Sequence, residues 1–182
     1  MGPQPVTPLS LAVIGIDPSS TSTAIAHADG AVRLVKLSTL PKGSRSGVRM
    51  GRIERIVTEV QVAVDAAKRV DLAVIEGYAY GTTNGAAMQA ELGGILRWHL
   101  WRQGIVVLEL TPGTLKKFAT GTGGAGKTAM VIAARDRLGY DGVSDDEADA
   151  LWLRAAGLTV LGEPPDGVTN GSAKGLIKVA VP

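Results

Sequence analysis

The chain has 182 residues, of which 45% are hydrophobic and 20% charged, so it is long enough for one domain with a buried core and too apolar to be disordered throughout. It contains no cysteine, which excludes disulfides, cysteine-ligated zinc, iron–sulfur clusters and a cysteine nucleophile. Its two histidines argue against a histidine-rich metal site, and no apolar run approaches the ~18–20 residues of a membrane span. Because the start MGPQPVTPLS lacks the basic residues of a signal peptide, we expect a cytoplasmic protein with no membrane partner.

The formal net charge of +2 suggests no polyanionic partner, but the charges are distributed unevenly. Residues 33–69 carry nine basic and three acidic side chains, and residues 97–139 carry seven basic and two acidic ones. Residues 141–166 carry one basic and seven acidic side chains. Two basic segments and one acidic segment fit a protein that holds a polyanion beside a cation site, although solvated helix faces would give the same pattern.

The N-terminal part of the chain predicts a meander of three antiparallel strands. Residues 1–10 hold three prolines and are expected to form a flexible tail. The apolar run Leu11–Ile16 fits a buried strand. A second strand is predicted over Thr21–Ala28 and, after the turn-forming pair Asp29-Gly30, a third over residues 31–38.

The rest of the chain alternates between helix and strand. Apolar residues recur at three- and four-residue spacing from Met50 to Val64, which predicts an amphipathic helix. The elements predicted after it are a strand at 72–76, a helix at 86–102, a strand at 105–110, a short helix from Pro112, a helix from a glycine-rich loop to about 138, and a helix at 146–156. This order predicts an α/β fold with a mixed sheet, in a domain over residues 11–157. Residues 158–182 form a C-terminal extension that need not be well ordered and ends in either a strand or a loose tail.

Two acidic residues stand at the ends of apolar strands. Asp17 follows the first predicted strand, and Glu76 ends the strand that begins at Leu72. A charge in such a position is costly to desolvate unless a partner compensates it, and a bound divalent cation would do so. Each residue could equally open a turn, and Asp17 before Pro18 has good turn chemistry.

A cluster of acidic residues opens the last predicted helix. Asp146 and Asp149 are three residues apart and share one helix face, and Asp145 is nearly as close to Asp149. Acidic residues in a first turn also favour the helix dipole, which explains one or two carboxylates more easily than four. Carboxylates without cysteine favour magnesium or manganese, and two such ions ~3.5–4 Å apart could activate a water molecule for phosphodiester hydrolysis.

Four short motifs follow one another between Leu11 and Gly157. They are Gly15-Ile16-Asp17-Pro18-Ser19, Ile75-Glu76, Pro112-x-x-Leu115-Lys116 with Gly121-x-Gly123-x-Ala125-x-Lys127, and Asp146-x-x-Asp149-Ala150-Leu151. Each motif is weak alone, but their order and spacing together resemble RuvC-type Holliday junction resolvases, the crossover junction endodeoxyribonucleases of the ribonuclease H-like superfamily. The resemblance implies a ribonuclease H-like fold, a five-stranded mixed sheet flanked by helices.

The resemblance also implies a catalytic and metal-binding tetrad of Asp17, Glu76, Asp146 and Asp149, with Asp145 outside the motif as a helix-start residue. It implies a homodimer in which each subunit nicks one strand of a four-way junction. The helix predicted over residues 86–102 matches the family's dimer helix in position. Its Trp98 and Trp101 would then be interface residues, and burial in the monomer core is the alternative.

The sequence departs from the family at one position of interest. The family tends to carry an aromatic residue three positions after the Glu, which packs on bases at the crossover, and this position is Ala79 here. The neighbouring Tyr78 or Tyr80 could replace it by stacking on a base. Strand separation at the junction could also work differently in this protein.

The loop from Gly121 to Thr128 matches the nucleotide-binding pattern G-x-x-x-x-G-K-[ST]. Such a loop must follow a buried strand, whereas the preceding residues Thr114–Ala119 are short and basic. We therefore expect no nucleotide cofactor. Backbone amides and a lysine at a helix start still favour a phosphate, here one from DNA.

On this basis Lys116 and Lys127 are the first candidates for DNA phosphate contacts, and Lys117 is the next. Arg45, Arg49 and Arg52 lie at helical spacing and form either a second phosphate-binding row or a solvated face.

The function that fits best is a metal-dependent, structure-selective DNA endonuclease that nicks four-way or related branched junctions with two magnesium ions. One rival is a sugar kinase or actin-type ATPase, because residues 15–22 also resemble the phosphate-binding start of those proteins, but their folds need two such domains. The other rival is a non-catalytic module of the same fold that binds branched DNA, against which the complete set of four carboxylates argues.

Overall fold

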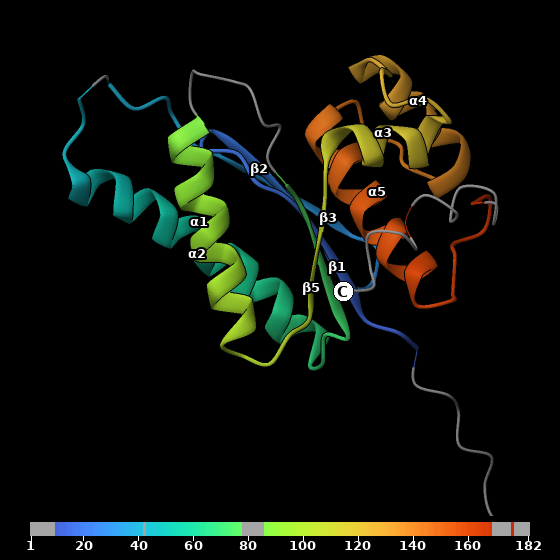
Figure 1. The fold of residues 1–182 in the computed structure, drawn as a ribbon, viewed down its shortest axis with the longest axis horizontal. Helices are drawn as coiled ribbons and strands as arrows, with labels where there is room; N and C mark the ends of the chain where they lie inside the picture. The colour runs from blue at the N-terminus through green and yellow to red at the C-terminus, as the bar shows by residue number, and fades with distance from the viewer. Residues whose placement is uncertain (1–9, 42, 78–85, 169–175, 177–182) are drawn as a thin grey trace, which may run out of the picture.

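The computed structural model describes residues 10–41, 43–77, 86–168 and 176. Five strands form one sheet in the order β3-β2-β1-β4-β5 (Figure 1). They are β1 (Val13–Asp17), β2 (Ser22–Ala26), β3 (Val32–Lys36), β4 (Leu72–Glu76) and β5 (Val107–Leu110). The first three strands pair antiparallel, whereas β4 lies parallel to β1 and β5 lies parallel to β4. The predicted mixed sheet, meander first and parallel strands after it, is therefore confirmed.

Helices cover both faces of this sheet (Figure 1). On one side lie α1 (Ser46–Ala67) and α2 (Ala86–Trp101). On the other side lie α3 (Pro112–Thr120), α4 (Lys127–Leu138) and α5 (Asp145–Val160). The alternation of side chains along β1 divides the core accordingly, because Ile14 and Ile16 pack with α1 and α2 while Val13 packs with α5.

The helix α5 lies unusually close to the central strand. A Cβ atom added to Gly15 of β1 would stand 2.2 Å from the carbonyl oxygen of Ala150 in α5. At the other end of the contact, a Cβ atom on Gly157 of α5 would stand 2.6 Å from side-chain atoms of Val13 and Val74. Two glycines therefore let the helix backbone rest on the sheet, and the first of them lies beside the end of β1 that carries Asp17.

The last helix is longer than the sequence predicts, since it runs to Val160 rather than ending at about residue 156. The reason is Gly157, which reads as a stop signal in the sequence but here serves close packing inside the helix. The boundary expected at residue 157 consequently falls within α5. Two residues of the C-terminal extension, Val168 and Leu176, are buried in the core cluster that contains α5. None of the described helices is long and apolar enough to cross a membrane.

Candidate active site

Asp17 and Glu76 stand at the same edge of the sheet. They end the neighbouring parallel strands β1 and β4, whose register pairs Ile16 with Ile75. Asp17 is 8% exposed, and its carboxyl group lies close enough to that of Glu76 for the two groups to act on each other's ionisation. Since carboxyl ends of adjacent parallel strands meet at one edge, the two strand-end residues singled out from the sequence are brought together.

The first turn of α5 supplies the other two carboxylates of the expected set. Ser144 begins the helix as its N-cap, and its side-chain oxygen accepts a hydrogen bond from the backbone N–H of Glu147 at 3.4 Å. Asp146 and Asp149 follow, three residues apart. Both lie close enough to Asp17 for their charges to act on it. The four residues predicted from the motifs are thus grouped in one region.

This grouping has a clear electrostatic cost. Burial, together with the charges of Glu76, Asp149 and Asp146, raises the pKa of Asp17 well above its ordinary value. Burial also raises the pKa of Glu76, and it raises the pKa of Asp149 to about 7 with a contribution from the charge of Glu76. Carboxyl groups that hinder one another's ionisation near neutral pH form an environment that favours a bound cation.

The donor set fits a hard divalent cation in its chemistry. One carboxylate oxygen of Asp149, Oδ1, is buried and accepts no hydrogen bond from the described residues. Such an orphaned acceptor is a candidate ligand for magnesium or manganese, which prefer carboxylate oxygens. As the side chains stand, however, no group of three or more potential ligands among the described residues is arranged to hold an ion.

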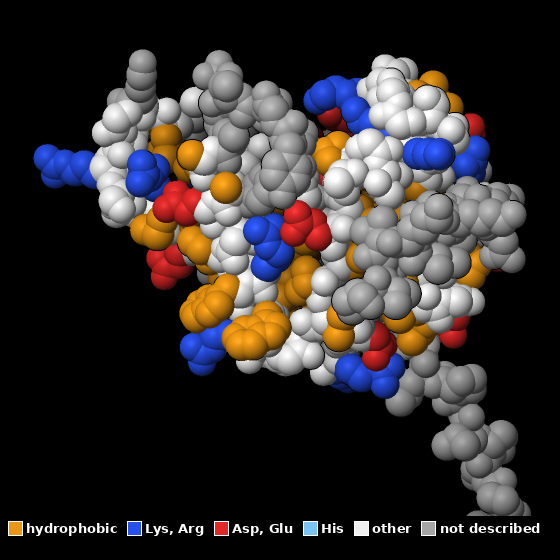
Figure 2. Space-filling model, in the orientation of Figure 1, with side chains coloured by type: hydrophobic (Ala, Val, Ile, Leu, Met, Phe, Trp, Pro, Cys, Tyr) orange, Lys and Arg blue, Asp and Glu red, His pale blue; other side chains and the backbone are white. Residues whose placement is uncertain are grey.

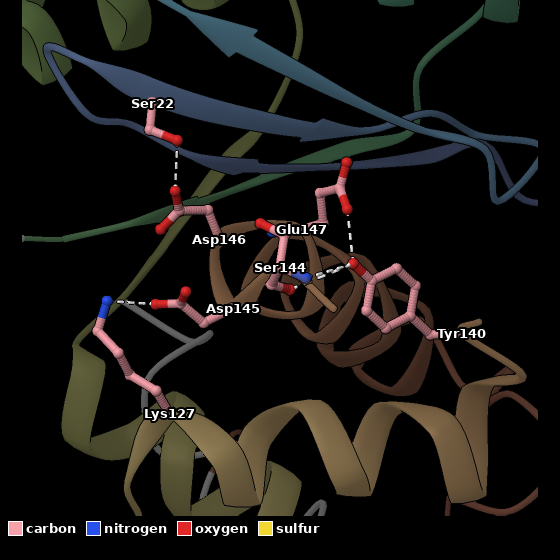
Figure 3. Close-up of polar contacts among 7 residues, drawn as sticks. All are labelled: Ser22, Lys127, Tyr140, Ser144, Asp145, Asp146 and Glu147. Atoms are coloured by element: carbon pink, nitrogen blue, oxygen red, sulfur yellow. Dashed lines mark hydrogen bonds and ion pairs between the residues drawn. The ribbon is translucent and has the colours of Figure 1, made fainter. Parts of the chain in front are cut away.

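The side chains of the first turn of α5 are turned to protein partners instead (Figure 3). The hydroxyl of Ser22, at the start of β2, donates to Oδ2 of Asp146. The ammonium of Lys127, at the start of α4, forms an ion pair with Oδ2 of Asp145. Glu147 accepts a hydrogen bond of 2.5 Å from the hydroxyl of Tyr140. The acidic turn is therefore tied to a strand, to a helix and to the preceding loop.

Two of the three lysines predicted to contact phosphates, Lys116 and Lys127, lie near this acidic group. Lys116 is close enough for its charge to lower the pKa values of Glu76 and Asp149, and it is partly exposed. Lys117 is exposed on α3, and Lys127 is exposed at the first position of α4. The charges of Lys116 and Lys127 and their proximity to the carboxylates suit a phosphate at the site.

The loop that resembles a nucleotide-binding motif connects two helices. Gly121 ends α3 in the left-handed conformation, with φ = 85°, and Lys127 begins α4. A helix and not a strand comes directly before the loop, in agreement with the sequence argument, so the loop lacks the strand–loop–helix arrangement of a nucleotide-binding loop.

Arg52 differs from its expected place in an exposed row. It is 9% exposed, and its guanidinium donates hydrogen bonds to the carbonyl oxygens of Ser20 and Ser38. Its donors thus tie two loops to α1 and do not face a ligand. Arg45 and Arg49 are exposed, so the row predicted along α1 is reduced to these two.

Of the four aromatic residues singled out in the sequence, the structure describes only the two tryptophans. Tyr78 and Tyr80 lie outside the described residues. Trp98 and Trp101 are 56% and 71% exposed, which excludes burial in the monomer core. They line a groove of about 670 Å³ together with Val106 and other residues after α2. Hydrophobic side chains gather on this face around the C-terminal end of α2 (Figure 2).

Sequence reasoning missed the partners of the acidic turn. Ser22 reaches Asp146 only because the hairpin of β1 and β2 returns the chain to the edge where Asp17 ends its strand. The serine- and threonine-rich run from residue 19 to 23 was a possible signal for such a partner. Tyr140 and Glu147 carry no motif that would have revealed their contact.

Comparisons with known proteins give the family. Residues 13–155 match the family described as Crossover junction endodeoxyribonuclease RuvC. The chain belongs to the RuvC family. That family consists of endodeoxyribonucleases, so the RuvC-type resemblance of the four motifs is confirmed.

Individual RuvC proteins agree with this assignment. The chain is 28% identical over 144 residues to the crossover junction endodeoxyribonucleases RuvC of Anaeromyxobacter sp. (strain K) and of Anaeromyxobacter dehalogenans (strain 2CP-C). Each match covers 78% of this chain and 77% of the relative.

Solved structures support the fold. The RuvC structure from Thermus thermophilus matches with a TM-score of 0.60 and 22% identity over 86% of this chain and 99% of that chain. The T. thermophilus RuvC in complex with Holliday junction substrate matches with a TM-score of 0.63 and 19% identity over the same shares. The ribonuclease H-like fold inferred from the sequence is therefore confirmed.

Proposed function

We propose that this RuvC-family chain is a metal-dependent endonuclease that nicks four-way or related branched DNA junctions by hydrolysing a phosphodiester bond. The observation that carries the proposal is the convergence of Asp17, Glu76, Asp146 and Asp149 from two strands and one helix. The relatives' names and the junction-bound T. thermophilus protein support the choice of DNA substrate.

The four carboxylates would hold two magnesium ions, and manganese could replace them. Bound ions of this kind activate a water molecule and stabilise the leaving oxygen. The chain itself gathers four carboxylates in a partly buried site. Partial burial there reduces the screening by water of their attraction for a cation. Asp17, the most buried of the four, is fixed by the strand that carries it.

The basic side chains around the carboxylates would bind the DNA backbone. Lys116 lies near enough to influence Glu76 and Asp149, so it would contact a phosphate at the site itself. Lys117 and Lys127 would contact neighbouring phosphates, and Arg45 and Arg49 would contact the backbone further away. Tyr78 or Tyr80 would stack on a base at the crossover.

The four carboxylates argue for a catalytic protein rather than a binding module, since binding DNA requires the lysines but not four mutually repelling carboxylates.

We further propose a homodimer, with Trp98 and Trp101 in the interface, because two such exposed tryptophans beside an apolar groove are unfavourable in a monomer.

The decisive experiment compares Asp17→Asn with the unchanged protein on synthetic four-way, forked and linear DNA, with and without magnesium. We expect Asp17→Asn to lose magnesium-dependent nicking while it still binds the four-way junction. Asp136→Asn is the matched control, because Asp136 is exposed on α4 outside the carboxylate group, and it should cut normally. Undiminished cleavage by Asp17→Asn would refute the mechanism, and binding without cleavage by the unchanged protein would favour the binding module.

A further inference from the structure

The ion pair between Lys127 and Asp145 joins a candidate phosphate contact to the helix that carries two of the carboxylates. Lys127 is the first residue of α4, and its side chain is 81% exposed. Asp145 is the first residue of α5, and its side chain is 31% exposed. The two residues are eighteen positions apart in the sequence and come from different helices, as Figure 3 shows. The family motif does not include Asp145.

In this pair the ammonium group of Lys127 is neutralised by a carboxylate of the protein itself. The hydrogen bond and the charge of Asp145 raise the pKa of Lys127, so the ammonium form is favoured. A carboxylate and a phosphodiester both offer anionic oxygens to an ammonium group, and an ammonium binds either as a point charge. A DNA phosphate that approaches Lys127 would therefore meet a position already filled by a similar ligand.

Asp145 also acts on the carboxylate group. It is one residue from Asp146, and its charge contributes to the raised pKa of Asp149. A single side chain thus faces the basic contact on one side and the acidic site on the other. This placement makes the charge of Asp145 relevant to any anion that enters between them.

We propose that Asp145 is an internal competitor that imitates a DNA phosphate at Lys127 in the free protein, so that DNA gains the Lys127 contact only by replacing it. The inference rests on the proposed function. DNA held elsewhere on the surface does not touch this pair and is unaffected. DNA that places a phosphate at the site must displace Asp145, which weakens its binding there.

The test is a double-mutant cycle on four-way junction binding, measured with magnesium in the Asp17→Asn background so that no cutting occurs. Asp145→Asn keeps the size of the side chain but weakens the competitor, and we expect affinity to rise about two- to fivefold, the range that corresponds to an exposed ion pair. Lys127→Ala should lower affinity. In the Lys127→Ala background, Asp145→Asn should change affinity by less than about 1.5-fold, because the ammonium group for which Asp145 and the phosphate compete is absent.

Salt gives a second measurement. The gain from Asp145→Asn should fade as ionic strength rises from about 50 to 300 mM, because exposed charges are screened over the Debye length. An equal gain in the presence and absence of Lys127 would overturn the proposal, since the effect would then be general charge repulsion. An unchanged or lower affinity for Asp145→Asn, in a protein whose thermal unfolding shows it to be folded, would overturn it as well. Neither result touches the proposed function, which fails only if Asp17→Asn cuts or the unchanged protein does not.

Discussion

The hydroxyl of Tyr140 donates a hydrogen bond of 2.5 Å to the carboxylate of Glu147. The oxygen of this hydroxyl also accepts a hydrogen bond of 3.0 Å from the backbone N–H of Ser144. Ser144 is the N-cap of α5, and Glu147 lies in the first turn of that helix. One buried phenol therefore joins the loop before α5 to its first turn, on either side of Asp146. The position of the acidic turn depends on this contact.

Tyr140→Phe tests that dependence. The variant removes the hydroxyl but keeps the ring, and it leaves a carboxylate without its donor, so we expect a loss of about 1–2 kcal/mol in the free energy of unfolding. For a domain of this size that corresponds to a fall in Tm of roughly 2–8 °C, measured by thermal unfolding. The nicking rate at saturating junction should fall more than junction affinity does. An unchanged Tm would show that the contact contributes nothing.

Gly15→Ala tests the close packing of α5 on β1. The added methyl group would collide with the backbone of Ala150 and Arg154, which cannot move without shifting the helix. We expect a loss of about 1–3 kcal/mol in stability and a loss of nicking, because Asp149 would move relative to Asp17. Gly51→Ala is the matched control, since a Cβ atom there meets nothing within 4 Å and alanine favours the helix α1. Its Tm should stay the same or rise.

Asp149→Asn tests the electrostatic cost of the site in the absence of divalent ions. Because the pKa of Asp149 is raised to about 7 in the folded protein, the folded state binds a proton more tightly than the unfolded state does. Its contribution to stability is therefore present below pH 4 and is lost as the pH rises from about 4 to 7. With a chelator, Asp149→Asn should have a higher Tm than the unchanged protein at pH 8, and the difference should shrink towards pH 4. A difference independent of pH would contradict this origin.

Arg52 and Arg49 should differ in what their loss affects. Arg52→Ala removes two hydrogen bonds to the carbonyl oxygens of Ser20 and Ser38, so stability should fall by about 2 kcal/mol or more. Arg49→Ala removes an exposed charge and should leave Tm within about 1 °C while junction binding becomes weaker at low salt. Thermal unfolding and a binding titration at two salt concentrations separate the two effects.

The exposed tryptophans should determine the oligomeric state. Replacing Trp98 and Trp101 by serine should shift the mass in solution from dimer to monomer, measured by light scattering after gel filtration, without a loss of folding. Replacing the exposed Ile132 of α4 by serine is the control, and it should leave the dimer intact. A dimer that survives the double substitution would place the interface elsewhere.

The site carboxylates could be predicted because short stretches of neighbouring residues fix their place in a strand or helix. Asp17 and Glu76 could be found because a charge that ends an apolar run is visible in a few neighbouring residues. The acidic helix start that holds Asp146 and Asp149 is equally local, and the resemblance to the family motif separated these two from Asp145. The mixed character of the sheet followed from the alternation of elements along the chain.

Contacts between distant segments could not be predicted in this way. Helical spacing places Arg52 in line with Arg49, but the carbonyl oxygens that bury it come from loops 32 and 14 residues away. The partner of Asp146 lies 124 residues earlier. Gly157 resembles a helix end in the sequence, and only its closeness to Val13 and Val74 explains why a glycine stands inside the helix.

The position of α5 as the last of the described helices has a consequence for synthesis of the protein. This one helix brings Asp146 and Asp149 and also covers Val13 and Val74 on one face of the sheet. A nascent chain that has not yet reached residue 145 therefore lacks half of the carboxylates and exposes part of its core. If the proposed function holds, such an unfinished chain would not cut DNA, because both its carboxylate set and this face of its core would be incomplete.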